Sequence, residues 1–314
     1  MPVRLPPLTE QPARLLLEDL IDYAGLFPPA QLSMAAAVRN FAHYRAGGHG
    51  WMLGRFVCSA SMLKTFSETA DPLLPRDDGA IPWRIAVTGS GNVASDMEAI
   101  AAFNERHRVC FNECGAIADS YELKAGSVKE VEDLHSAVPE NLLTYIELPL
   151  DTHVDELVAA VAGVGRRAKM RMGGVSANAF PQAANVAAFL RACLDHQVTS
   201  KATAGLHHPL SGPYRLTYED DAPTGRMFGF ANLLLSAAIM VNGGSNTDAA
   251  RVLEISHPDA LHVGEASVVV SIPGGDSVHI DRSLVQHVRH QVVVSIGSCS
   301  FTEPVHESTE LDWI

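Results

Sequence analysis

Charged side chains stand inside segments of this chain that are otherwise apolar, and two consecutive histidines follow one of these segments. The segment 201–209 reads KATAGLHHP. It begins like a β-strand that carries Lys201, and it ends in a glycine followed by His207 and His208. A lysine can form a Schiff base with a ketone or an aldehyde, and a histidine can transfer protons or bind a metal ion. The end of this segment is therefore the first place where we expect chemistry.

Short β-rich runs alternate with amphipathic helical stretches from Trp51 onward. This alternation is typical of βαβ units with parallel strands. We therefore predict an α/β fold, a TIM-type (β/α) barrel, whose seventh strand the pattern does not locate. The expected strands are 51–60, 83–89, 109–116, 142–150, 167–174, 198–206 and 292–301, and the expected helices between them are 93–107, 127–138, 153–164 and 182–196.

The two ends of the chain do not follow this strand–helix alternation. Helical spacing over 11–24 and 33–46 predicts an N-terminal helical extension at 1–50, before a barrel domain at 51–314. After residue 206 we expect helices over 227–242, 247–255 and 281–290, and a hairpin that turns at Pro273–Asp276. No linker divides these parts, so we expect one compact domain. An open doubly wound sheet is the alternative, but a GxGxxG motif between a strand and a helix is missing.

Strands of a parallel barrel are buried on both faces, so each charged residue in them calls for an explanation. Ions from several neighbouring strands converge only at the barrel axis. An ion-pair layer that merely fills the barrel is one interpretation, although desolvating ions costs several kcal/mol each. With four cations against two carboxylates, we instead predict a locally positive site for a small anionic metabolite. The six residues are Arg55, Glu113, Glu147, Lys169, Arg171 and Lys201.

A resemblance to known proteins enters at this point. Counted from Trp51, Lys201 lies on the sixth strand, where many Schiff-base aldolases of the aldolase-type TIM-barrel superfamily keep their lysine. The run KATAG at 201–205 resembles the lysine strand of deoxyribose-phosphate aldolase, although the following His207-His208-Pro209 departs from that pattern. The resemblance implies a carbon–carbon lyase on a barrel. The motifs DYAGLFPPA at 22–30, KATAGLHHP and GSCSFTEP at 297–304 are also similar to a group of uncharacterised bacterial proteins, which implies no activity.

The preferred hypothesis is an aldolase-like lyase that needs no cofactor. Neighbouring cations would lower the pKa of Lys201, so that its amine attacks the carbonyl carbon of the substrate. Glu147 or Glu113 would move protons, and His207 is a further catalytic candidate. Residues expected to hold the substrate's anionic and polar groups are Arg55, Lys169, Arg171, Thr203, Ser298 and Ser300.

Three other interpretations remain open. His207, His208 and Glu147 could bind Zn or Mn and support a metal-dependent lyase, isomerase or hydrolase. Cys299, which follows the last expected strand, either packs at a tight turn or acts as a nucleophile with a histidine. The barrel could also bind a metabolite without turning it over.

Composition limits the partners. A net charge of −13 disfavours nucleic acids and anionic membranes, and the apolar run Phe228–Val241 is shorter than the roughly 20 residues that a spanning helix needs. The five cysteines form no CxxC pair, and the first residues have no apolar core of a secretory signal, so we expect a cytoplasmic protein. Assembly into a homo-oligomer is left open.

Overall fold

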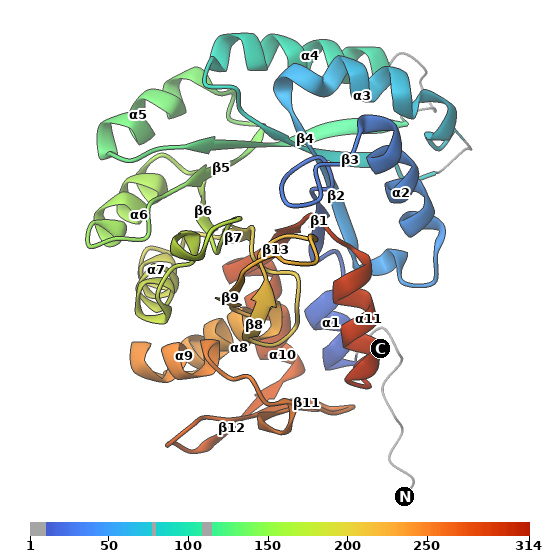
Figure 1. The fold of residues 1–314 in the computed structure, drawn as a ribbon. Helices are drawn as coiled ribbons and strands as arrows, with labels where there is room; N and C mark the ends of the chain where they lie inside the picture. Colours follow the sequence, from blue (N-terminus) through green and yellow to red (C-terminus); the bar gives the residue numbers. More distant parts are fainter. Residues whose placement is uncertain (1–10, 77–79, 109–114) are drawn as a thin grey trace, which may run out of the picture.

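The computed structural model describes residues 11–76, 80–108 and 115–314, and its centre is a closed barrel of parallel strands (Figure 1). Each strand pairs in parallel with the next, and the last pairs with the first. The predicted TIM-type barrel is therefore confirmed. The barrel strands are β1 (Ile21–Tyr23), β2 (Leu53–Ser59), β3 (Trp83–Thr88), β4 (Ala116–Lys124), β5 (Leu143–Glu147), β6 (Arg167–Arg171), β7 (Ser200–Thr203) and β13 (Val293–Ser298).

Helices cover the outside of the barrel, as Figure 1 shows. Most face the strands with one apolar side, but α8 is buried all round. Its two polar residues satisfy neighbouring backbone: Asn232 donates to the carbonyls of Val252 and Ile255, and Ser236 donates to that of Ala249. The helices are α1 (Pro12–Leu17), α2 (Met34–Ala46), α3 (Leu63–Ala70), α4 (Val93–Arg108), α5 (Val128–Ala137), α6 (Val154–Gly163), α7 (Ala183–Asp195), α8 (Phe230–Val241), α9 (Asn246–Leu253), α10 (Arg282–His287) and α11 (Thr302–Glu310).

The strand that the sequence pattern does not locate is β1, which lies inside the segment expected to be a helical extension. Its three residues pair with β13 on one side and with β2 on the other. The expected helix over 11–24 ends at Leu17, and a run of three residues is too short to show a strand period. The barrel therefore begins at Ile21 rather than at Trp51. Lys169 consequently lies on the sixth barrel strand, and Lys201 lies on the seventh.

The third expected strand, 109–116, lies almost entirely outside the described residues. Residues 109–114, which include Glu113, lie outside the described residues, and the strand here is β4 at Ala116–Lys124. Its sequence, AIADSYELK, carries three ionic side chains and does not resemble a buried strand. The position of β4 matters because this strand contributes Glu122 to the interior of the barrel.

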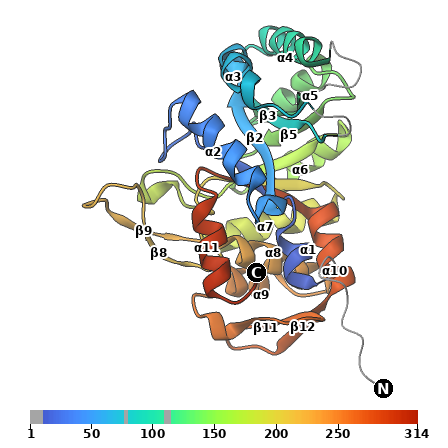
Figure 2. The same ribbon diagram turned by 90° about the vertical axis from the view of Figure 1, so that its right-hand side faces the viewer.

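Two small sheets decorate the barrel. The antiparallel pair β8 (Gly212–Arg215) and β9 (Thr224–Met227) forms a hairpin that projects beside α11 (Figure 2). The expected hairpin near Pro273 is confirmed as β11 (Ser267–Ser271) and β12 (Ser277–Asp281), to which β10 (Leu261–Val263) adds a third strand. Across the described ranges, no helix is both long and apolar enough to span a bilayer.

Strand register aligns the interior charges. Glu147 pairs with Lys124 on one neighbour and with Lys169 on the other, and Lys169 pairs with Lys201. Residues at one register position on neighbouring strands face the same side of the sheet. The charged residues that the sequence places in separate strands therefore meet in one layer inside the barrel.

Candidate functional site

A cavity of about 530 Å³ opens at the carboxyl ends of the barrel strands. This is the end at which active sites of such barrels lie. Its floor carries Glu122 and Lys169 from β4 and β6, and its walls come from the loops after β1, β6, β7 and β13 and from the β8–β9 hairpin. The polar and charged residues that line it are Thr88, Glu122, Lys169, Arg171, Thr203, His207, His208, Tyr214, Arg215, Thr217, Tyr218, Cys299 and Glu303.

Lys201 is enclosed below this cavity and does not line it. Its side chain is 1% exposed, and its Nζ donates to Asp22 and, at 2.7 Å, to Oε1 of Glu122. Burial would lower the pKa of Lys201, but Asp22 and Glu122 outweigh this effect and raise the pKa. The expectation that neighbouring cations lower the pKa of Lys201 is therefore wrong, because its direct partners are carboxylates.

Asp22 on β1 anchors the other side of Lys201. It is fully buried, and it also accepts hydrogen bonds from the hydroxyl of Ser295 at 2.9 Å and from the backbone amide of Arg55 at 2.8 Å. Burial would raise the pKa of Asp22, but Lys201 lowers it below its usual value. The sequence analysis includes Asp22 only in the motif DYAGLFPPA and in the helix expected over 11–24, because β1 is not predicted as a strand.

Glu122 joins the two strand lysines. Its Oε1 accepts from Lys201, and its Oε2 accepts from Nζ of Lys169 at 2.8 Å. Burial would raise the pKa of Glu122, but the two lysines outweigh it and lower the pKa to about 2. Sequence reasoning missed Glu122. The signal that could have found it was its position in an apolar–polar alternation that reaches Lys124.

Lys169 is the strand lysine that faces the cavity. Its Nζ lies 2.8 Å from Glu122 and 2.9 Å from Oε2 of Glu147, so it is held between two carboxylates. The sequence pattern suggested Lys169 as an anion-binding residue. Of the two strand lysines, Lys169 is the one whose amine a molecule in the cavity can contact.

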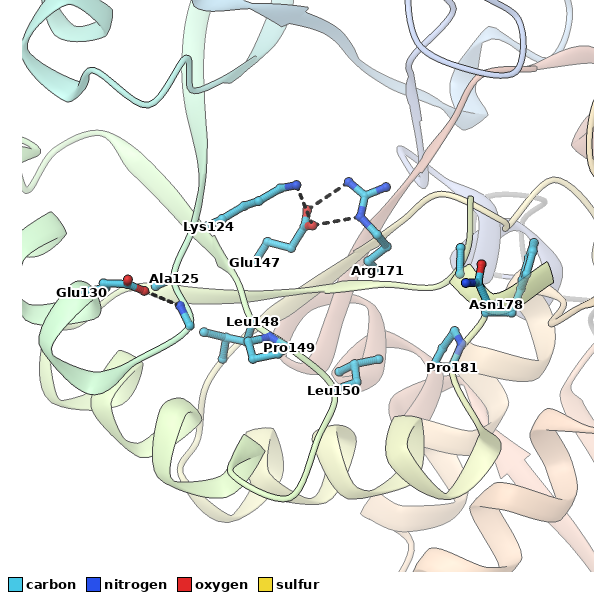
Figure 3. Close-up of a pocket in the computed structure, with 13 residues that line it drawn as sticks. Lys124, Ala125, Glu130, Glu147, Leu148, Pro149, Leu150, Arg171, Asn178 and Pro181 are labelled. Atoms are coloured by element: carbon cyan, nitrogen blue, oxygen red, sulfur yellow. Dashed lines mark hydrogen bonds and ion pairs between the residues drawn. The ribbon is translucent and has the colours of Figure 1, made fainter. Parts of the chain in front are cut away.

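Glu147 connects the barrel interior with a second, shallower cavity of about 640 Å³ at the carboxyl ends of β4, β5 and β6. Figure 3 shows Lys124 and Arg171 reaching the Glu147 carboxylate from opposite sides. Nε of Arg171 lies 2.9 Å from Oε1 of Glu147, and Nζ of Lys124 lies 3.7 Å from it. Burial would raise the pKa of Glu147, but Lys169 and Arg171 lower it. Arg171 lines both cavities.

Arg55 does not line the main cavity. Its guanidinium forms a bidentate pair with Asp119, at 2.7 and 2.8 Å. All four cations expected at the site thus face carboxylates: Lys201 faces Asp22, and the three others face Asp119, Glu122 or Glu147. The expected excess of positive charge is therefore not found among the described residues, because Asp22, Asp119 and Glu122 were not counted from the sequence.

A second polar group lies on the upper wall, where β7 and β13 end. Nδ1 of His207 lies 3.3 Å from Oε2 of Glu303 and 3.2 Å from the hydroxyl of Ser298, and Sγ of Cys299 lies 3.9 Å from both ring nitrogens. Tyr218 on the hairpin donates to Glu303 at 3.1 Å. Burial would lower the pKa of His207, but Cys299 and Glu303 raise it to about 9. The raised pKa favours the imidazolium form of His207, which pairs with the Glu303 carboxylate.

The remaining candidates have mainly structural contacts. Thr203 lines the cavity, whereas the Ser300 hydroxyl accepts from the backbone amide of Glu303 and so helps to begin α11. His208 stacks on Tyr214, with ring centroids 3.4 Å apart, and its Nδ1 contacts Glu307.

The metal-binding interpretation needs His207, His208 and Glu147 to converge. Here they have different partners: Glu303 for His207, Glu307 for His208, and Lys169 with Arg171 for Glu147. Among the residues with described positions, no group of three or more His, Cys, Asp and Glu side chains is arranged to hold a metal ion. Glu113, which the sequence offers beside Glu147 as a proton-transferring carboxylate, falls outside them.

The arrangement therefore offers a cavity-facing amine between two carboxylates, and an imidazolium–carboxylate pair higher on the wall. Comparisons of the chain with protein-family models, with curated proteins and with solved structures find no match.

Proposed function

We propose that the protein is an enzyme, a carbon–carbon lyase of the aldolase type, in which a lysine forms a Schiff base with a carbonyl substrate. The observation that carries the proposal is that the Lys169 amine faces the 530 Å³ cavity while Glu122 and Glu147 hold it. The closed barrel supports the proposal, because the cavity lies at the strand ends where such barrels carry out their chemistry.

Lys169 takes the nucleophilic role first expected of Lys201. Lys201 is enclosed and does not line the cavity, so a substrate there cannot reach its amine. Its role is to hold Glu122 ionised beside Lys169. In this proposal Lys169 reacts with the substrate, and Lys201 keeps the shared carboxylate of Glu122 ionised.

The proton balance of Schiff-base formation suits this arrangement. An ammonium that condenses with a ketone gives an iminium and water, so two of its three protons leave with the carbonyl oxygen and one remains on nitrogen. Glu122 and Glu147 each accept a hydrogen bond from Nζ of Lys169, so they can relay these two protons from nitrogen to oxygen. No metal or organic cofactor is needed.

Bond cleavage then follows from the charge on the iminium. The electron pair of the bond between the α and β carbons moves toward the iminium and gives an enamine, while the β-hydroxyl loses its proton and becomes a carbonyl. The His207–Glu303 pair on the upper wall can exchange that proton. Protonation of the enamine and addition of water to the resulting iminium release the second product and restore Lys169.

Reductive trapping tests the proposal. The protein is incubated with pyruvate or another carbonyl acid and with sodium borohydride, and the modified peptide is located by mass spectrometry. We expect the adduct on Lys169 and its loss in Lys169→Met. Lys64→Met, which changes an exposed lysine of α3, is the matched control and should keep the adduct.

Three other outcomes of this experiment would change the proposal. An adduct on Lys201 would return the nucleophilic role to that residue. Turnover without an adduct that is abolished by EDTA would favour the metal-dependent alternative. Ligand binding with neither adduct nor turnover would leave a barrel that binds a metabolite without converting it.

A further inference from the structure

Apolar side chains line one part of the main cavity. Leu216 and Met227 come from the β8–β9 hairpin, Phe27 comes from the loop after β1, and Val175 comes from the loop after β6. Leu216 and Met227 are almost fully buried, whereas half of Val175 is exposed at the mouth. Three segments far apart in the sequence therefore supply one apolar wall. A wall of this kind gains free energy when a ligand covers it, because apolar surface leaves water.

The apolar wall lies above the reactive amine along the strands. Lys169 precedes Arg171 by two residues on β6, and Arg171 pairs with Thr203, the last residue of β7. Val175 follows Arg171 by four residues, so it lies beyond the strand end, toward the mouth. A molecule whose carbonyl reaches Lys169 therefore passes Arg171 first and leaves its remaining atoms beside the hairpin.

Contacts with the barrel hold the hairpin over the cavity. Tyr214 stacks on His208, and its hydroxyl donates to the carbonyl of Leu210 at 3.0 Å. Tyr218 bonds to Glu303 on α11. The wall is therefore formed before any ligand arrives, which reduces the entropy that binding must overcome.

Acidic residues next to the cavity lining disfavour a phosphorylated ligand. The hairpin end carries Glu219, Asp220 and Asp221 in succession, all exposed, directly after the cavity-lining Tyr218. Arg215 lies 3.8 Å from Asp220, so this cation already has an acidic neighbour. Deeper in the cavity, Arg171 contacts Glu147 mainly through Nε, which leaves guanidinium donors for one carboxylate.

We propose that the substrates are 2-oxo acids and related carbonyl carboxylates that bear an aryl or branched alkyl group. The carbonyl meets Lys169, the carboxylate meets Arg171, and the apolar group packs against Leu216 and Met227. This assignment rests on the proposed Schiff-base function, but the apolar subsite can be tested apart from it.

The first experiment compares borohydride trapping of the full chain by pyruvate, phenylpyruvate and glycolaldehyde phosphate. Phenylpyruvate should reach half-maximal trapping at a concentration at least about tenfold lower than pyruvate, since burying a phenyl group is worth that much or more. Glycolaldehyde phosphate should trap most weakly. Equal or better trapping by pyruvate or by glycolaldehyde phosphate would overturn the assignment and leave the Schiff base intact.

A pair of exposed aliphatic residues provides matched variants. Val175→Asp places a charge on the apolar wall at a position that is half exposed, so the fold should tolerate it. Ile81→Asp makes the same kind of change on a residue that is 71% exposed and does not line the cavity. The preference for phenylpyruvate should fall several-fold in Val175→Asp and stay unchanged in Ile81→Asp. An unchanged preference in both variants would count against the wall as the subsite.

A second measurement separates the two proposals. Phenylpropanoate and propanoate have no ketone and cannot form a Schiff base, so calorimetric titration with them reports the subsite alone. Phenylpropanoate should bind at least about tenfold more tightly than propanoate, even if no carbonyl acid gives an adduct. Equal affinities would overturn the apolar subsite, whereas absence of every adduct would overturn only the proposed function.

Discussion

Lys169 on β6 and Lys201 on β7 are directly paired in register. The carboxylate of Glu122 lies between their amines and accepts from both. Each lysine has a further carboxylate on its other side, Asp22 for Lys201 and Glu147 for Lys169. The result is a row of alternating charges across the barrel. Because every member has two oppositely charged or polar partners, removal of one member leaves a buried charge without full compensation.

Lys201→Met should destabilise the protein strongly. The substitution keeps the apolar stem but removes the ammonium that compensates Asp22, a fully buried carboxylate. Breaking a buried ion pair from one side typically costs about 3–5 kcal/mol. Urea unfolding followed by circular dichroism at pH 7 would measure the change in the free energy of unfolding.

The double variant Lys201→Met with Asp22→Asn supplies the control. It removes the uncompensated charge as well as the ammonium, so it should be more stable than Lys201→Met alone. A double variant that is equally or less stable would show that Asp22 depends on Lys201 less than the geometry indicates.

Acid should weaken the protein through Glu122. The two lysines lower the pKa of Glu122 from 4.5 to about 2 in the folded state. A lowered pKa contributes stability above the unfolded pKa, and this contribution is lost as the pH falls from about 4.5 through about 2. Its size is about 3 kcal/mol, at 1.36 kcal/mol for each pKa unit.

Unfolding free energies measured between pH 6 and pH 2 would test this prediction. Glu122→Gln should be less stable at pH 6 and should lose less stability on acidification. Glu130→Gln is a comparison on the exposed surface of α5. If Glu122→Gln and the unmodified protein lose equal stability over this interval, Glu122 is not the group that titrates.

The barrel could be predicted from the sequence because six of its strands lie in β-rich runs that alternate with helical patterns. β1 could not, because Ile21–Tyr23 takes its strand conformation from pairing on both sides rather than from its own length. β4 could not either, because Glu122 and Lys124 interrupt its apolar pattern. The charged side chains that form the interior layer are therefore the same ones that keep β4 from being recognised as a strand in the sequence.

The candidate site was predictable in its residue types but not in its pairing. Lys169, Arg171, Lys201 and Glu147 do meet inside the barrel, as the strand periodicity predicted. Which lysine faces the cavity depends on the groups that enclose each amine, and Asp22, which encloses Lys201, lies on the strand that the sequence pattern does not locate. The contacts of His207 with Glu303 required the position of α11 relative to β7, which no local pattern encodes.

Alkali should weaken the protein through His207. Cys299 and Glu303 raise the pKa of His207 from 6.5 to about 9. A raised pKa contributes stability that is fully present below the unfolded pKa and is lost as the pH rises through about 9. The loss should be about 3 kcal/mol between pH 6.5 and pH 9.5.

Two variants make this measurement specific. His207→Asn should remove most of the stability change over this pH range. His306→Asn alters an exposed histidine of α11, whose partner is Glu310, and should leave the change intact. NMR titration of the histidine ring protons would give the pKa of His207 directly, and a value near 6.5 would contradict the prediction.

Arg171 and Arg55 differ in whether they line the cavity. Arg171 lines the cavity, whereas Arg55 is occupied by Asp119 outside it. Arg171→Met should raise the half-saturating pyruvate concentration in the trapping assay about tenfold or more, because a charge-assisted hydrogen bond contributes about 1.5–3 kcal/mol. Arg55→Met should leave this concentration within about twofold while lowering the free energy of unfolding by roughly 1–3 kcal/mol. The reverse pattern, with pyruvate binding lost in Arg55→Met and kept in Arg171→Met, would place the substrate carboxylate at Arg55 and refute the assignment of the cavity.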